Sequence, residues 1–329
     1  MKQHIRSLSL VCGLLSIASL ASAGQLSGTL SGPSLGYVWN DSDGKIHPLL
    51  GMTGNATIGN GQDLGFAISQ AVSLNGRYFL ASTDASPSLI FINAVTVPAS
   101  ITAISNAPTG PSRIAASRGG TAASLYYEEP QRVLIVTGLP SAPKVTHAID
   151  ISAGGGTLSR MTVSDDGSLF LYSASQGADD ALFAWTPAAG HRLLTTADSI
   201  SAIALTPGGD AIVADASRGE IFSIADPKGS AGRLFLADDR SGVLNPTSVA
   251  VSNAGQIYIA NGGTDTILTL DSAGNLLRTQ QCGCELAGFF PLKDSLYRLS
   301  NRTDQTLYLL EAGANGDRVS FVPPGRKNQ

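Results

Sequence analysis

The sequence predicts an all-β fold, a β-propeller of four-stranded antiparallel blades, with six blades favoured and seven as the alternative. Short apolar runs, rich in β-branched and aromatic residues, alternate with small polar turns along the chain. A motif of two such runs around a tight turn recurs at intervals of 39 to 47 residues, which is the length of one propeller blade. Long helical periodicity is absent after residue 23.

The stretch 247–279 shows one repeat in full. Four apolar runs of strand length are separated by Gly, Asn, Asp or Ser, and they are Val249–Val251, Ile257–Ala260, Ile267–Leu270 and Leu276–Leu277. Consecutive short strands of this kind form an up-and-down antiparallel sheet. Because such a sheet cannot bury both of its faces alone, it requires neighbouring copies to stack against.

Residues 1–23 have the pattern of a secretory signal peptide. A basic start precedes the apolar core Leu8–Leu20 and the small-residue cleavage site Ala21–Ala23. We therefore expect export to the periplasm or the cell exterior. No other stretch is long and apolar enough to cross a bilayer, so we expect no membrane span. Residues 24–36 are small and polar, and we expect a flexible lead-in there.

The first predicted strands form a hairpin over Tyr37–Leu50, with Asp43-Gly44 in its turn because that pair tolerates positive φ. Residues 51–65 are rich in Gly and Asn and predict a loop. This hairpin is left over once six repeats are counted. It either closes the ring by pairing with the last blade or forms half of a seventh blade, since an unlocked ring would expose a large apolar flank.

Six repeats follow, each with a turn between its first and second strands. The turn residues are Gly76, Gly120, Gly167, Gly209, Gly255 and Asp294. The third strands are predicted at residues 89–92, 133–136, 182–185, 220–224, 267–270 and 307–310. The fourth strands have a weaker pattern, as outer strands should, and are predicted at residues 101–104, 147–151, 192–194, 234–236, 276–278 and 319–322. Residues 37–322 are therefore one propeller domain, and 323–329 are a C-terminal tail.

The repeat SVAVSNAGQIYIANGGTDTILTLDSAGNLLRT resembles blades of NHL-type and YVTN-type propellers and, more loosely, those of the SMP-30/gluconolactonase-like superfamily. This resemblance concerns the architecture, and it covers most of the chain after the signal segment. The chain as a whole resembles exported bacterial propellers. The resemblance implies the fold, but propellers host both enzymes and pure binding modules, so it does not choose between them.

Candidate ligand residues lie at the ends of the second strands. In propellers the loops between second and third strands lie near the mouth of the central channel, and the polar residues at these ends are Asp84, Glu128, Ser175, Asp215, Asn261 and Asn301. A ring of oxygen atoms suits Ca²⁺ or another hard cation. The same residue types are also ordinary turn formers, so both interpretations stand, and Asp215 with Asn261 is the strongest pair.

The resemblance to gluconolactonases implies a divalent cation held in the channel by carboxylate and Asn side chains. This sequence departs from that pattern, because the usual Asn-Gly pair ahead of an inner strand is replaced by Leu244–Ser248, which contains no Gly. The sequence also has no Glu before Glu128. A Ca²⁺-dependent lactonase-like hydrolase or lyase is therefore the alternative function and not the favoured one.

Cys282 and Cys284 are the only cysteines beyond the signal segment. An exported chain folds in an oxidising compartment, so we predict a disulfide between them in the linker between two blades. The chain must turn to bring the two Cα atoms within bonding range, and Gly283 permits this turn. A redox role or a soft-metal site is the alternative, although two thiolates alone do not complete a zinc site.

Composition excludes several function classes. The net charge is -4, charged residues make up 14% of the chain, and no Lys/Arg run occurs, so we expect no nucleic-acid partner. The HExxH and phosphate-loop motifs are absent, and so is the helical periodicity that must follow the Ser of a nucleophile elbow. The isolated Trp39 and Trp185 are interpreted as blade packing. The sequence thus predicts a secreted or periplasmic monomer that binds a small molecule, glycan or protein at its channel face, with no catalytic activity identified and Ca²⁺ as the one candidate cofactor.

Overall fold

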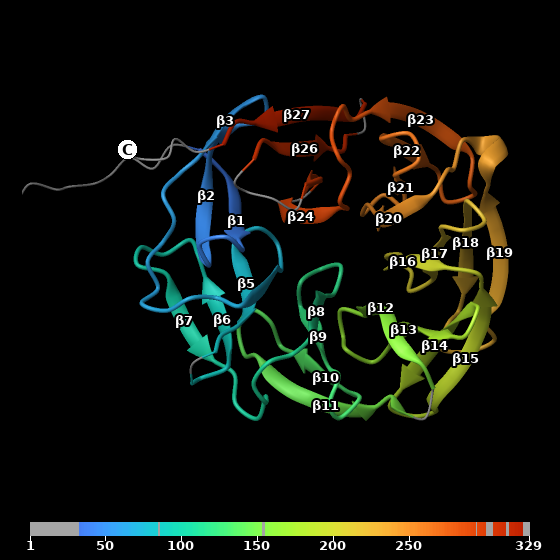
Figure 1. Ribbon diagram of the computed structural model, residues 1–329, viewed down its shortest axis with the longest axis horizontal. Coiled ribbons are helices and arrows are strands. Elements are labelled where there is room, and N and C mark those ends of the chain that lie inside the picture. Colours follow the sequence, from blue (N-terminus) through green and yellow to red (C-terminus); the bar gives the residue numbers. More distant parts are fainter. Residues whose placement is uncertain are drawn as a thin grey trace, which may run out of the picture. The chain divides into compact units, whose positions relative to one another are not determined.

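The computed structural model describes residues 33–84, 86–152, 155–293, 295–300, 305–313 and 316–324, which form antiparallel sheets around a central axis (Figure 1). The predicted signal peptide, the lead-in up to residue 32, Asp294, Asn301 and residues 325–329 lie outside this described part. Within it there are seven sheets, which we call blades A to G in chain order. In the same residues no helix has the length and hydropathy that a membrane span needs.

Blade A has three strands and each of the other blades has four. Blade A consists of β1 (Ser34–Asn40), β2 (Lys45–Met52) and β3 (Asn55–Ile58). Blades B and C consist of β4 (Gln70–Ser73), β5 (Tyr78–Ser82), β6 (Leu89–Asn93), β7 (Ser100–Ala103), β8 (Arg113–Ala116), β9 (Ala122–Tyr127), β10 (Arg132–Thr137) and β11 (Lys144–Asp150). Blades D and E consist of β12 (Thr157–Val163), β13 (Phe170–Gln176), β14 (Asp179–Thr186), β15 (Gly190–Ala197), β16 (Ile200–Leu205), β17 (Ala211–Asp215), β18 (Glu220–Ala225) and β19 (Gly232–Ala237).

The short 3-10 helix η2 (Asp239–Ser241) connects blades E and F. Blades F and G consist of β20 (Pro246–Val251), β21 (Ile257–Asn261), β22 (Thr266–Leu270), β23 (Leu276–Gln281), β24 (Phe290–Lys293), β25 (Leu296–Arg298), β26 (Leu307–Glu311) and β27 (Arg318–Val322). Neighbouring strands in the chain pair with each other in every blade, so the up-and-down order predicted from the repeat is confirmed. The propeller fold is confirmed with it.

The preference for six blades was wrong, because the structure has seven. The leftover N-terminal hairpin is β1–β2, and β3 completes it as a blade. The loop predicted over 51–65 contains β3, whose four residues Asn55–Ile58 are flanked by glycines and lack an apolar run. Blade A does not exchange strands with blade G, since β27 pairs only with β26 in the described sheets. It lies between blades G and B and packs against both.

The hydrophobic core is divided among the interfaces between blades. In the described part of the chain, seven clusters of buried side chains each combine residues from two neighbouring blades. Strands such as β9 and β21 are buried on both faces, because alternate residues point into the two adjoining interfaces. Phe170 and Ile257, from different interfaces, are 0% and 1% exposed. Each blade is therefore stabilised by its neighbours and not by a core of its own.

The first strand of each blade is the innermost one and lines the central channel. All seven inner strands, β1, β4, β8, β12, β16, β20 and β24, lead into a turn at the same end of the channel, which we call the inner-turn face. The loops between second and third strands and the connections between blades lie at the opposite end, which we call the connector face. The predicted ligand residues that the structure describes belong to the connector face.

Candidate functional site in the central channel

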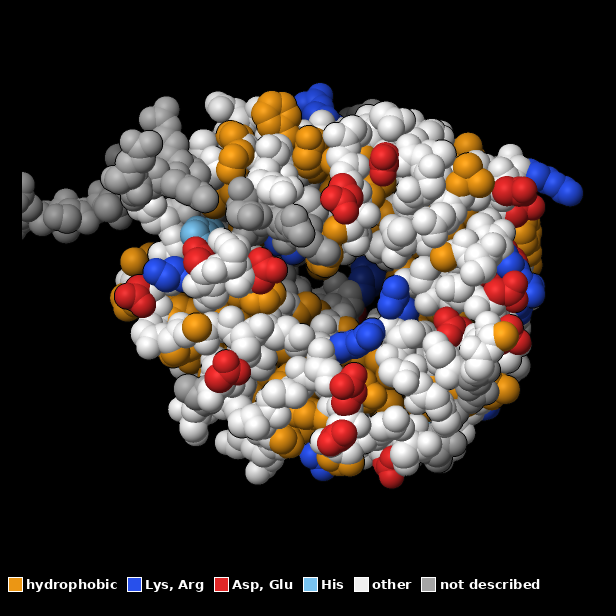
Figure 2. Space-filling view, viewed as in Figure 1, with side chains coloured by type: hydrophobic (Ala, Val, Ile, Leu, Met, Phe, Trp, Pro, Cys, Tyr) orange, Lys and Arg blue, Asp and Glu red, His pale blue; other side chains and the backbone are white. Residues whose placement is uncertain are grey.

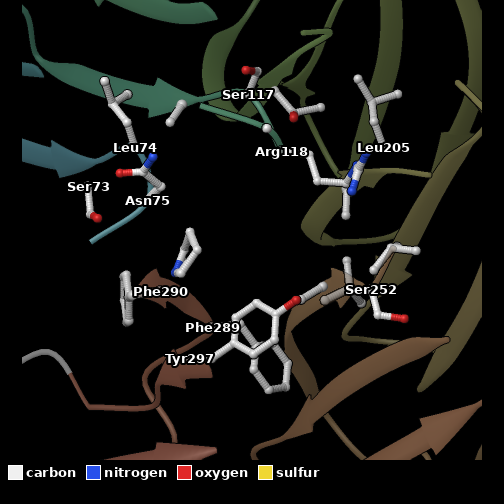
Figure 3. Close-up of a pocket in the computed structure, with 18 of the residues that line it drawn as sticks. Ser73, Leu74, Asn75, Ser117, Arg118, Leu205, Ser252, Phe289, Phe290 and Tyr297 are labelled. Carbon is white, nitrogen blue, oxygen red and sulfur yellow. The ribbon is translucent and has the colours of Figure 1, made fainter. Parts of the chain in front are cut away.

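A cavity of about 400 Å³ opens in the channel at the inner-turn face, and we call it the inner-turn cavity. It is formed where inner strands of blades B to G end and enter their turns. One wall is aromatic, with Phe289, Phe290 and Tyr297, and Arg118 projects into the space from the opposite side (Figure 3). None of the described lining residues is an Asp, Glu or His. The described lining therefore presents hydrogen-bond donors and positive charge beside a flat apolar wall.

Arg118 is held in place by residues from two other blades. Its guanidinium donates to Oδ1 of Asn253 in the β20–β21 turn, across the channel. It also lies 4.0 Å from Oδ2 of Asp165 in the β12–β13 turn, and Oδ1 of that carboxylate accepts from the backbone N–H of Gly119 at 2.6 Å. The Arg118 side chain stays 29% exposed. Because a guanidinium has five N–H donors, these contacts leave donors for a ligand.

Tyr297 brings a hydroxyl to the aromatic wall. Burial raises the pKa of its hydroxyl, and the positive charge of Arg118 opposes that rise. Its ring packs edge-on against Phe289, with centroids 5.9 Å apart. The hydroxyl is therefore protonated at neutral pH and available as a neutral hydrogen-bond group.

A second cavity, of about 500 Å³, lies at the connector face between blades D, E and F. We call it the connector cavity, and its described lining includes Ser175, Asp180, Ser201 and Arg160. Desolvation lowers the pKa of Arg160, and nearby Arg113 lowers it further. Figure 2 shows Lys and Arg side chains around the central opening on the face in view.

Ser175, Asp84 and Glu128 lie in different settings at the connector face. Ser175 lines the connector cavity and its hydroxyl donates to Oδ1 of Asp180 at 2.7 Å. Asp84 and Glu128 are exposed at the ends of their strands. The predicted Asn301 lies outside the described residues. The proposal that these residues form a ligand ring stays a prediction.

Asp215 and Asn261 are both fully buried, and each bonds to loops adjoining its own blade. Oδ1 of Asp215 accepts from the backbone N–H groups of Ser199, Ser217 and Arg218 at 3.1 to 3.2 Å, and Oδ2 accepts from that of Asp198 at 3.0 Å.

The amide of Asn261 accepts from the backbone N–H of Leu244 and donates to the Gly242 carbonyl at 2.9 Å and to the Thr264 hydroxyl at 2.7 Å. These two side chains thus organise backbone. In the described part of the chain, no group of three His, Cys, Asp or Glu side chains is placed to hold a metal ion.

Cys282 and Cys284 form a disulfide in the structure, with their Cα atoms 5.1 Å apart. Gly283 between them has φ 63°, the left-handed conformation that the turn requires. Both cysteines are buried in the cluster between blades F and G. The bridge lies in the linker where the sequence placed it, away from the described lining of the inner-turn cavity.

The sequence reasoning missed Arg118 and the aromatic wall because it searched only the connector face. The repeats did contain one indication that Arg118 has a special role. Up to their Gly residues the inner turns read SLNG, SRGG, SDDG, TPGG and SNAG, and Arg118 is the one basic residue within these four-residue segments, while Arg77 directly follows the first. A long cation in a turn otherwise made of small or acidic residues is a candidate for a role beyond turn formation.

The sequence matches no protein-family model and no curated protein sequence. Among solved structures, a protein of unknown function from Desulfotomaculum acetoxidans is similar, with 14% identity and a TM-score of 0.57 over 87% of this chain and 99% of that chain. A protein from Bacteroides fragilis, proposed to be a 6-phosphogluconolactonase, has 11% identity and a TM-score of 0.57 over 88% of this chain and 92% of that chain.

A protein from Bacteroides uniformis with the same proposed activity has 13% identity and a TM-score of 0.52 over 75% of this chain and 82% of that chain. At these identities the similarity shows the propeller fold alone. The narrower resemblance to NHL-type and gluconolactonase-like repeats stays a prediction.

Proposed function

We propose that this protein is an exported, monomeric propeller that binds a small acidic ligand with a flat apolar part in the inner-turn cavity. The observation that supports this most directly is the position of Arg118 opposite an aromatic wall, in a cavity whose described lining has no acidic side chain. The volume of about 400 Å³ falls in the range of small-molecule sites. Asn75 and Ser117 add polar groups at the cavity rim.

The chemistry of the lining suits an anion. A guanidinium binds carboxylate or phosphate oxygens through two parallel hydrogen bonds, and these charge-assisted bonds are stronger than neutral ones. An aromatic ring on the ligand would stack against Phe290 or Tyr297. Asn253 and Asp165 hold Arg118 in place before the ligand arrives, so little side-chain entropy is lost on binding.

Calorimetric titration with phenyl phosphate tests this proposal, with phenol as the neutral analogue. We expect phenyl phosphate to bind and phenol not to bind measurably. Arg118→Gln should weaken phenyl phosphate binding about tenfold or more, since a hydrogen bond to a charged group contributes about 1.5–3 kcal/mol. Arg240→Gln, which changes an exposed arginine in η2, is the matched control and should leave the affinity unchanged. Equal binding by wild type and Arg118→Gln would contradict the proposal.

Lactone hydrolysis is the second candidate, supported by the two Bacteroides structures proposed to be 6-phosphogluconolactonases. A phosphorylated lactone would present its phosphate to Arg118. Acid release from 6-phosphogluconolactone, followed with and without Ca²⁺ and EDTA, separates the two candidates. Catalysed release that EDTA abolishes would favour the metal-dependent enzyme, and binding without release would favour the binding module.

A further inference from the structure

A third cavity, of about 330 Å³, lies beside the inner-turn cavity between blades G, A and B. We call it the Trp39 cavity. It shares Val72, Ser73, Phe290 and Pro291 with the inner-turn cavity, so the two are compartments of one channel. Its other walls are mainly apolar, from β1, β4 and β24. Its described lining has four side chains with polar hydrogens, Tyr37, Trp39, Ser73 and Arg298, of which Trp39 and Arg298 carry N–H donors.

Both of those side chains have buried donors without a partner. Nε1 of Trp39 and Nε of Arg298 are shielded from solvent, and neither has a hydrogen-bond partner among the described residues. No hydrogen bond or ion pair joins any other part of the Arg298 guanidinium to the described residues either. Native proteins rarely leave buried donors unpaired, because each such group costs roughly 1–3 kcal/mol and a charged one costs more. Two unpaired donors lining one cavity indicate a missing acceptor.

Arg298 is oriented by packing alone. Its guanidinium carbon lies 4.6 Å from the centroid of the Phe290 ring, which holds the planar group over the aromatic face. Burial lowers the pKa of Arg298 to about 10, and Asp41, which also lines the cavity, acts in the opposite direction. The half-buried side chain is thus charged at neutral pH, and its Nε is shielded from solvent.

The charges that line the cavity favour a monoanion over a dianion. Arg298 supplies one positive charge, and the carboxylate of Asp41 on the same lining already balances it, so each negative charge on a ligand is costly and a ligand with one costs less than a ligand with two. A carboxylate carries one charge at neutral pH, whereas a phosphate monoester carries nearly two. A planar carboxylate also matches the side of a guanidinium, where Nε and one Nη donate in parallel.

We propose that the Trp39 cavity is a subsite for a carboxylic acid, whose carboxylate is held by Arg298 and Trp39 with its apolar part against Tyr37, Val38 and Phe290. This inference rests on the proposed function in that both cavities belong to one ligand channel. The two cavities share Phe290, but their charged residues differ, Arg298 here and Arg118 there, so either proposal can fail without the other. The ligand class is therefore the carboxylic acids that are small enough for a cavity of about 330 Å³.

The fluorescence of Trp39 provides the first test. The chain has two tryptophans, so Trp185→Phe leaves Trp39 as the single emitter. We expect acetate and benzoate to change this emission saturably, and benzamide, the neutral analogue of benzoate, not to change it. Arg298→Lys in the same background should weaken the benzoate response at least tenfold. If the cavity holds only water, neither acid should give a saturable response, and that result would overturn the proposal.

Thermal melting of Arg298→Met provides the second test. Replacing an unpaired buried charge by an apolar side chain of similar length should leave the ligand-free protein equally stable or more stable. Benzoate also belongs to the ligand class proposed for the inner-turn cavity, so the comparison is made in the Arg118→Gln background. Benzoate should raise the melting temperature of Arg118→Gln and not that of the double variant Arg118→Gln/Arg298→Met. An equal benzoate shift in these two variants would contradict the assignment.

Discussion

At the residue scale, Asp215 and Asn261 show how a correct sequence observation can carry a different meaning in the structure. Both are polar residues at the ends of second strands, as the repeat indicates. Polar residues there are compatible with a channel ligand or with a turn. Their full burial and their bonds to backbone N–H groups fit the second use, because each side chain ties the start of its own blade to the following turn, and their place in a ligand ring stays a prediction.

Asp215→Ala should lower the free energy of unfolding by about 3–5 kcal/mol, because it leaves four backbone N–H groups around the site without their acceptor. Urea unfolding followed by circular dichroism measures the change. Asp84→Ala is the control, since Asp84 lies in the corresponding loop of blade B, two residues after β5 ends at Ser82, and is exposed. Its expected effect is within about 0.5 kcal/mol. Equal losses in the two variants would refute the hydrogen-bond account.

Arg298 and Trp39 could not be paired from sequence. They lie near opposite ends of the propeller domain, and no periodicity relates a residue of blade A to one of blade G. Trp39 was interpreted as blade packing, and its ring does pack against the cluster between blades A and B. Its unpaired indole N–H and the cavity beside it are visible only once the ring is closed.

At the scale of elements, the turns between first and second strands were predicted well because turn chemistry is local. Gly76, Gly120, Gly167, Gly209 and Gly255 all have positive φ, which is the conformation that Gly adopts without steric cost. The local pattern cannot say which of these turns also contacts another blade. The turn at Gly76 contacts blade G, because a Cβ placed on Gly76 would lie 1.8 Å from the carbonyl oxygen of Leu292 in β24.

Gly76→Ala should therefore destabilise the protein far more than Gly209→Ala. Both positions have positive φ, so both variants incur a strain of about 1–2 kcal/mol. No atom lies within 4 Å of the corresponding Cβ at Gly209, whereas Gly76→Ala must push apart the backbones of blades B and G. We expect an additional loss of roughly 2 kcal/mol or more in Gly76→Ala, measured by urea unfolding. Similar losses in both variants would show that the close approach is unimportant.

At the scale of the whole molecule, the propeller is closed by packing between blades A and G, and the described sheets exchange no strand there. The cluster between blades A and G joins Val38, Leu49 and Ala56 to Leu292, Leu307 and other side chains of blade G. Without blade A, the facing sides of blades G and B would both be exposed to water. The ring therefore needs the seventh blade although blade A has one strand fewer than the others.

Leu49→Ala tests this closure, with Leu50→Ala as the control on the same strand. Leu49 is fully buried in the cluster between blades A and G, and Leu50 is 38% exposed. Leu49→Ala should lower the free energy of unfolding by about 2–5 kcal/mol, because it creates a cavity in the closing interface. Leu50→Ala should lower it by less than about 1 kcal/mol. If both variants unfold at the same urea concentration as the wild type, blade A does not hold the ring together.

The sequence by itself determined the strands of blades B to G, their up-and-down order and the turns between them, but not β3 of blade A. Alternation and turn residues act over a few neighbouring positions. The sequence also indicated that the sheets must stack, because strands such as Ile257–Asn261 are apolar on both faces. Only the tertiary structure decided the number of blades and the location of the cavities. Those properties depend on which distant surfaces meet when the ring closes, as Arg118 meets Asn253 and as Trp39 meets the cavity of Arg298. Contacts between residues so far apart in the chain leave no periodic trace in the sequence.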